Sequence, residues 1–135
     1  MIYLDANIFL YASMNEGALG QKSRALLTRI AKKEEMGYTS YLTWDEFVHS
    51  LRKLFGREAA IDQGGKLLNF LNLQFISADA SVLEKAQQLI EKYTVHPRDA
   101  IHIASAIIHN IPTIISNDSD FQKIEEIKTI PVDKI

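Results

Sequence analysis

Acidic side chains stand at four points of the sequence where an apolar segment ends or a helix is expected to begin. Asp5 interrupts the apolar run MIYLDANIFLYA, and Asp118 and Asp120 follow the apolar segment TIIS. Glu46 and Asp99 fall in the expected first turns of two helices, in LTWDEF and PRDAIH. Carboxylate oxygens are the ligands that hard divalent cations prefer. The chemistry of the chain therefore depends on whether folding brings these acids together.

Taken singly, most of these acids have an ordinary structural explanation. Thr43-x-x-Glu46 matches a capping box, and for Glu46 alone this interpretation is favoured by about two to one. Asp99 is a common kind of first-turn acid, and one aspartate of SNDSDF would cap the short helix that Phe121 begins. Asp5 is different, because burying an ionised carboxylate is costly unless it is paired or coordinated. No local role accounts for Asp5.

Taken together, the acids predict a metal site. Like charges crowded in one cleft raise one another's pKa and destabilise the fold, and a divalent cation removes that penalty. Hard carboxylate oxygens favour Mg²⁺ or Mn²⁺ over softer metals. A zinc site is not expected, because the chain has no cysteine and its four histidines lack zinc-ligand spacing.

The elements that must position these acids can be read from the apolar pattern. Short strands are expected at 2–4, 38–41, 73–76, 113–116 and 127–130, with helices at 21–33, 43–55, 58–71, 81–93 and 97–108 between them. Asn7 could cap a helical turn after the first strand, Asp79 or Ser81 could cap the helix that ends near Tyr93, and Pro97 suits the first position of a helix. This alternation predicts an α/β fold of three layers, α/β/α, around a parallel sheet. In such sheets, ligand-binding groups gather at the carboxyl ends of the strands.

The amino-acid composition limits the number of domains, the cellular location and the mode of nucleic-acid binding. A chain of 135 residues, 47% hydrophobic and 24% charged, predicts a single domain over residues 1–135. The absence of cysteine fits a cytoplasmic protein, and no apolar run is long enough to span a membrane. The formal net charge of −2 provides no overall attraction to nucleic acid, so nucleic-acid binding would need a local basic surface.

The motifs LDAN, LTWDEF, PRDAIHIASA and ISNDSDF occur in the order and approximate spacing of PIN-domain ribonucleases. The chain resembles most closely the small members that act as toxins of VapBC toxin–antitoxin pairs, from Ile2 to about Pro131. This resemblance implies a parallel sheet of four to five strands with the order 3-2-1-4-5. It also implies an endoribonuclease that cuts RNA with a metal-activated water, works as a homodimer and is silenced by an antitoxin protein.

The resemblance also assigns site residues. Asp5, Glu46, Asp99 and Asp118 correspond to the acidic residues that bind Mg²⁺ or Mn²⁺ in this family, with Glu46 preferred over Asp45 because the family's acid precedes the apolar residue of the helix. Asp120 matches an additional acid that some members carry. Asn7 and Ser116 match small polar residues that brace the site.

An acidic cleft that takes RNA needs basic residues at its rim. Lys53, Arg98, Arg52 and Arg57 are the candidates, and for each of them an ordinary solvated position is about equally plausible. His102 lies one helical turn beyond Asp99, and a buried, hydrogen-bonded histidine is a more common arrangement than a general base.

Two other functions compete with a nuclease. A catalytically silent PIN-like module would bind RNA or a protein without cutting and without needing a cation. A phosphatase or nucleotide hydrolase is disfavoured, because LDAN lacks the second aspartate of a DxD motif and the chain has no GxxxxGK[ST] loop.

Overall fold

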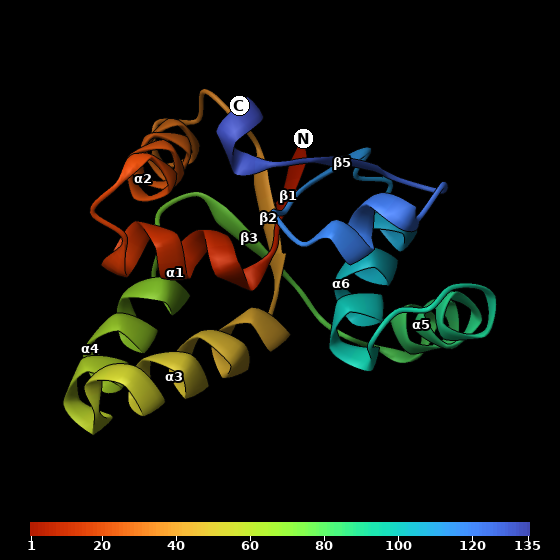
Figure 1. The fold of residues 1–135 in the computed structure, drawn as a ribbon, viewed down its shortest axis with the longest axis horizontal. Helices are drawn as coiled ribbons and strands as arrows, with labels where there is room; N and C mark the ends of the chain where they lie inside the picture. Colours follow the sequence, from red (N-terminus) through yellow and green to blue (C-terminus); the bar gives the residue numbers. More distant parts are fainter.

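The computed structural model describes all 135 residues as a five-stranded sheet between two layers of helices (Figure 1). The strands are β1 (Ile2–Leu4), β2 (Gly37–Ser40), β3 (Leu73–Ile76), β4 (Thr113–Ile115) and β5 (Lys128–Ile130). The helices are α1 (Ala6–Met14), α2 (Ala18–Ala31), α3 (Leu42–Phe55), α4 (Arg57–Leu68), α5 (Ala80–Lys92) and α6 (Pro97–Ile108), with short 3₁₀ helices η1 (Ser119–Lys123) and η2 (Val132–Lys134).

All neighbouring strands pair in parallel, in the order β3-β2-β1-β4-β5. The predicted fold class and strand order are therefore confirmed. The chain places β2 and β3 on one side of β1, then crosses over to place β4 and β5 on the other. The carboxyl ends of β1 and β4 thus flank the point where the direction of strand addition reverses, which is where open α/β sheets bind ligands.

Successive side chains of the central strands point to opposite faces of the sheet, so the protein has one hydrophobic core on each face. Tyr3 and Ile114 face a core formed with α5 and α6, whereas Leu4 and Ile115 face a core formed with α1, α2, α3 and α4. Figure 1 shows this division, with α1–α4 on one side of the sheet and α5 and α6 on the other. Because helices cover both faces of the sheet at its centre, the side chains of β1 and β4 that face either core are apolar.

Several expected helix boundaries are confirmed, and others are corrected. Asp79 caps α5 through the backbone N–H of Val82, Pro97 starts α6, and Gly56 ends α3 with a φ of 93° that favours glycine. The expectation that Asn7 caps the first helix is wrong, because Asp5 is the N-cap of α1. Helix α2 also begins three residues earlier than predicted. No helix is both long and apolar enough to cross a lipid bilayer.

Candidate active site

Four of the predicted acids lie at one edge of the sheet. Asp5 follows β1, Asp118 follows β4, and Glu46 and Asp99 lie near the starts of α3 and α6. Burial and, after it, the charges of Asp118, Asp5 and Glu46 raise the pKa of Asp99 from 3.8 to about 6, whereas His102 acts in the opposite direction. The other three carboxyl groups are therefore close enough to repel that of Asp99.

Asp5 has a local role that the sequence analysis did not recognise. Its side chain is 5% exposed, and one carboxylate oxygen caps α1 by accepting the backbone N–H of Asn7 at 2.6 Å. The other oxygen accepts the hydroxyl of Ser116, which follows β4. Burial raises the pKa of Asp5, and these two hydrogen bonds act in the opposite direction. Asp5 is thus fixed in place by two elements, neither of which supplies a positive charge.

The loop after β4 is organised by Ser116 and Asp118. The fully buried Ser116 hydroxyl also accepts the backbone N–H of Asp118 at 3.1 Å, which connects this loop to Asp5. Asp118 caps η1 by accepting the N–H of Asp120 at 2.9 Å, and its other oxygen accepts no hydrogen bond. Asp120 instead pairs with Lys123 at 3.0 Å. The two aspartates of SNDSDF therefore have different surroundings, with Asp118 nearer to the other acids.

Glu46 does not form the capping box that its local pattern suggested. Helix α3 begins at Leu42 after the N-cap Tyr41, so Glu46 is two residues beyond the position from which a capping-box acid reaches the N-cap backbone. One oxygen of Glu46 is hydrogen-bonded to Nε2 of His102, and Nδ1 of His102 is hydrogen-bonded to Tyr3 Oη at 2.6 Å. Glu46 is thereby directed to the neighbourhood of the other acids.

A buried pair of threonines fixes the start of α3 against β1. Thr39 on β2 donates its hydroxyl to the carbonyl of Leu4 at 2.8 Å and is hydrogen-bonded to the hydroxyl of Thr43 at 2.7 Å. Both threonines are fully buried. Because Leu4 precedes Asp5 and Thr43 precedes Glu46 by one turn, this pair sets the distance between two of the acids.

Thr39→Val is expected to destabilise the protein by about 1–3 kcal/mol, because it leaves the buried hydroxyl of Thr43 without its partner. Urea unfolding measures the change. Thr28→Val is the matched control, because the Thr28 hydroxyl is exposed and contacts only a carbonyl of its own helix; its effect should stay within about 0.5 kcal/mol. Equal effects of the two substitutions would contradict the role assigned to Thr39.

The negative charges and the ligand oxygens of these four acids fit a divalent cation. No lysine or arginine forms an ion pair with any of them; the ion-pair contacts are those of Glu46 with His102 and of Asp99 with His96, the latter at 4.0 Å. One oxygen of Glu46, one of Asp118 and both of Asp99 accept no hydrogen bond. The side chains as they stand form no group of three that could hold a metal ion. Coordination would therefore need side-chain rotation of the three acids that have free oxygens.

The basic residues are distributed unevenly around this edge. Arg98 lies 3.9 Å from Asp45, so it joins the starts of α6 and α3 beside the acids. Arg52 and Arg57 instead line a hollow between α3 and α4. Lys53 lies two turns beyond Glu46, about 10 Å along the helix axis. Of the four predicted rim residues, Arg98 is the one that the structure places next to the acids.

Sequence analysis missed two aromatic residues at the site. Tyr3 contacts His102 from β1, and Tyr11 on α1 is near enough to Asp5 and Asp118 for their charges to raise the pKa of its hydroxyl, after the larger effect of burial. Both positions look like ordinary core tyrosines in the sequence. No local pattern in the sequence indicated that either tyrosine belongs to the site, because the groups that they face are remote in sequence.

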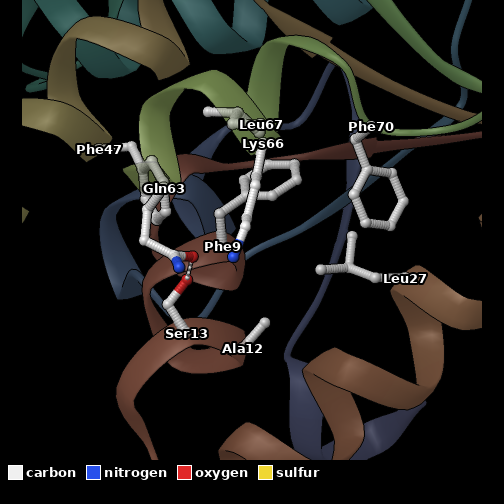
Figure 2. A pocket seen from close by; sticks show the side chains of 9 residues that line it. All are labelled: Phe9, Ala12, Ser13, Leu27, Phe47, Gln63, Lys66, Leu67 and Phe70. Carbon is white, nitrogen blue, oxygen red and sulfur yellow. Dashed lines mark hydrogen bonds between the residues drawn. The ribbon is translucent and has the colours of Figure 1, made fainter. Parts of the chain in front are cut away.

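An apolar pocket lies further along α1, between α1, α2, α3 and α4 (Figure 2). It has a volume of about 340 Å³ and is lined by Phe9, Ala12, Ser13, Leu27, Phe47, Gln63, Lys66, Leu67 and Phe70. At its edge, the Ser13 hydroxyl and the Gln63 side chain are hydrogen-bonded at 3.4 Å. The pocket contains no carboxylate, so it is separate from the acids in both place and chemistry.

Comparisons with known proteins agree with this architecture. The ribonuclease VapC2 of Methanocaldococcus jannaschii is 21% identical over 97% of this chain and 93% of its own length. A toxin–antitoxin complex from Klebsiella pneumoniae contains a chain with a TM-score of 0.72 and 18% identity, and the match covers 100% of both chains. The sarcin–ricin loop cleaving toxin VapC20 of Mycobacterium tuberculosis has a TM-score of 0.75 and 18% identity over 95% of this chain and 99% of its own.

At these identities the solved structures establish a shared fold and nothing finer. The decisive match is to a family model. The model of the PIN domain covers residues 2–127, which includes every strand except β5 and all four of the acids at the sheet edge. The chain belongs to the PIN domain family.

Proposed function

We propose that this protein is a metal-dependent endoribonuclease and the toxin of a toxin–antitoxin pair. The observation that carries the proposal is the meeting of Asp5, Glu46, Asp99 and Asp118 at the sheet edge without a lysine or arginine to neutralise them. The relative from Methanocaldococcus jannaschii is named a ribonuclease, which supports the same activity. Mg²⁺ and Mn²⁺ are the cations that these hard oxygens favour.

In this proposal the chain's own residues bind the cation and orient the RNA. Glu46, Asp99 and Asp118 supply free oxygens for the cation, while Asp5 adds charge from a position that the α1 cap and Ser116 hold fixed. Bound divalent ions polarise a phosphodiester and lower the pKa of a bound water. Arg98 would contact a phosphate of the RNA at the rim. No side chain needs to act as nucleophile.

The antitoxin is proposed from two observations. A similar chain occurs in a toxin–antitoxin complex, and the acids form a negatively charged cluster that an arginine of a protein partner would neutralise. The apolar pocket of Figure 2 lies apart from the acids, further along α1, the helix that Asp5 caps. An antitoxin segment could place an arginine at the acids and apolar side chains in the pocket. Self-association as a homodimer stays a prediction.

The nuclease proposal is tested with the purified chain and end-labelled RNA. Cleavage is expected with Mn²⁺ or Mg²⁺, with no cleavage in EDTA, and the products should carry a 5′-phosphate and a 3′-hydroxyl. Ribosomal, transfer and messenger RNA should be offered separately, because the site residues do not specify the substrate class. A folded protein that binds RNA equally well in EDTA and cuts none of these substrates would instead be the silent binding module.

A further inference from the structure

We propose that His102 is a positioning residue, held by Tyr3, that fixes the carboxylate of Glu46 in the active site. The inference rests on the proposed nuclease function and identifies how one of its acids is oriented. It assigns His102 no contact with RNA or with a cation. Its basis is a hydrogen-bonded chain of three side chains from three different elements.

The chain runs through the interior from β1 to α3. Tyr3 and His102 are 0% and 1% exposed, and the Tyr3 hydroxyl lies 2.6 Å from Nδ1 of His102. The two rings meet edge to face, with centroids 5.7 Å apart and an interplanar angle of 63°. On the opposite side of the imidazole, Nε2 is hydrogen-bonded to Glu46. Tyr3 and the ring of His102 are therefore held by packing, and the ring has no room to rotate freely.

The partners of the imidazole determine how His102 is oriented. A carboxylate only accepts hydrogen bonds, so Nε2–H of His102 is the donor to Glu46. Nδ1, on the other side of the ring, faces the buried hydroxyl of Tyr3 at 2.6 Å. Tyr3 therefore holds the ring in the orientation that turns Nε2–H towards Glu46.

This arrangement excludes two other roles for His102. A metal ligand needs an unprotonated nitrogen facing the cation, and a general base needs one facing its substrate, but both nitrogens are already used. What remains is control of Glu46, whose side chain would otherwise adopt many rotamers. With one oxygen held by His102, the other stays free to face the neighbouring acids. Hydrogen bonds of this kind to ligating carboxylates strongly affect metal affinity and activity.

The test compares His102→Leu with His102→Gln, whose amide nitrogen can take the place of Nε2–H. His102→Leu is expected to lower kcat and to raise the Mn²⁺ concentration for half-maximal cleavage, each roughly 10- to 100-fold, with KM for RNA almost unchanged. His102→Gln should restore most of both losses. His109→Leu, which removes a histidine from the end of the same helix, is the matched control and should behave as wild type.

A double-mutant cycle separates positioning from a general structural role. In a Glu46→Gln background, His102→Leu should have little further effect on Mn²⁺ binding, because the carboxylate that it orients is gone. Tyr3→Phe, which keeps the ring and removes only the hydroxyl, provides a variant that should fold; it should raise the Mn²⁺ concentration for half-maximal cleavage, by less than His102→Leu does, because the imidazole loses one of its two contacts. Additive losses in the cycle, or wild-type Mn²⁺ dependence in Tyr3→Phe, would overturn the inference.

The two proposals fail in different ways. If the wild-type protein cuts no RNA, the nuclease proposal fails, while calorimetric Mn²⁺ binding to the wild type, His102→Leu and Tyr3→Phe still tests His102. If the wild type cuts RNA and His102→Leu cuts it equally well at the same Mn²⁺ concentration, only the positioning role is refuted.

Discussion

Replacing Asp5 with asparagine is expected to lower metal-dependent RNA cleavage by at least about 100-fold, because a carboxylate at the centre of a metal site contributes several kcal/mol. The fold should survive. Asparagine is an equally good N-cap, so its side-chain oxygen can still accept the N–H of Asn7, and its amide can still pair with the hydroxyl of Ser116. Initial cleavage rates at saturating Mn²⁺ measure the effect, with circular dichroism to verify folding.

The neighbouring acids of α3 provide a matched comparison for the same assay. Glu46→Gln should cause a loss similar to that of Asp5→Asn, whereas Asp45→Asn should retain activity within a few fold. Asp45 is 57% exposed at its side chain, and its ion pair with Arg98 spans 3.9 Å, so it contributes little by itself. A severe loss in Asp45→Asn with normal activity in Glu46→Gln would mean that the wrong acid of the pair has been assigned.

Asp99→Asn is expected to make the metal-free protein more stable at neutral pH while making it inactive. Burial and the neighbouring acids raise the pKa of Asp99 from 3.8 to about 6 in the folded protein. The folded state therefore binds the proton more tightly than the unfolded state does, and the stability that this provides is lost as the pH rises through about 6. At pH 7 the ionised Asp99 costs up to about 3 kcal/mol, which the substitution relieves.

The measurement is the melting temperature in EDTA as a function of pH. Asp99→Asn should melt roughly 5–10 °C above wild type at pH 7, and the difference should shrink towards pH 4. The control is Asp79→Asn, which changes a helix cap away from the site; this variant should melt close to wild type at both pH values. A lower melting temperature for Asp99→Asn at pH 7, or a gain that does not depend on pH, would contradict the expected repulsion.

Divalent cations should stabilise the wild-type protein but not a variant that lacks two of the acids. Mn²⁺ is expected to raise the melting temperature of wild type by binding only the folded state, and to do little for a variant with both Asp5 and Asp99 replaced by asparagine. An equal shift in both proteins would place the bound ion elsewhere on the molecule.

The fold was predictable because its signals are local. Short apolar strands alternate with amphipathic helices, and Gly56, Asp79 and Pro97 mark helix ends through backbone chemistry that any fold would respect. Helix α1 was only partly foreseen. Its sequence, ANIFLYASM, is apolar on nearly every side because it packs between the other helices of its layer, so it lacks the periodicity that identifies a surface helix.

The candidate site was predictable in its residues and not in its contacts. Carboxylates at strand and helix ends can be recognised by type and position, but their partners are remote in sequence. Ser116 lies 111 positions from Asp5, and His102 lies 56 positions from Glu46. The capping-box interpretation of Glu46 failed for the same reason, since the local pattern contains no information about a histidine that approaches from α6.

The position of β1 at the middle of the sheet has a consequence for protein synthesis. Asp5 is synthesised 111 residues before Ser116, whose hydroxyl donates to its carboxylate. Ser116 follows β4, and β4 pairs directly with β1, so this edge of the sheet cannot close until β4 has been synthesised. In the proposed nuclease, a nascent chain that lacks β4 would therefore be inactive.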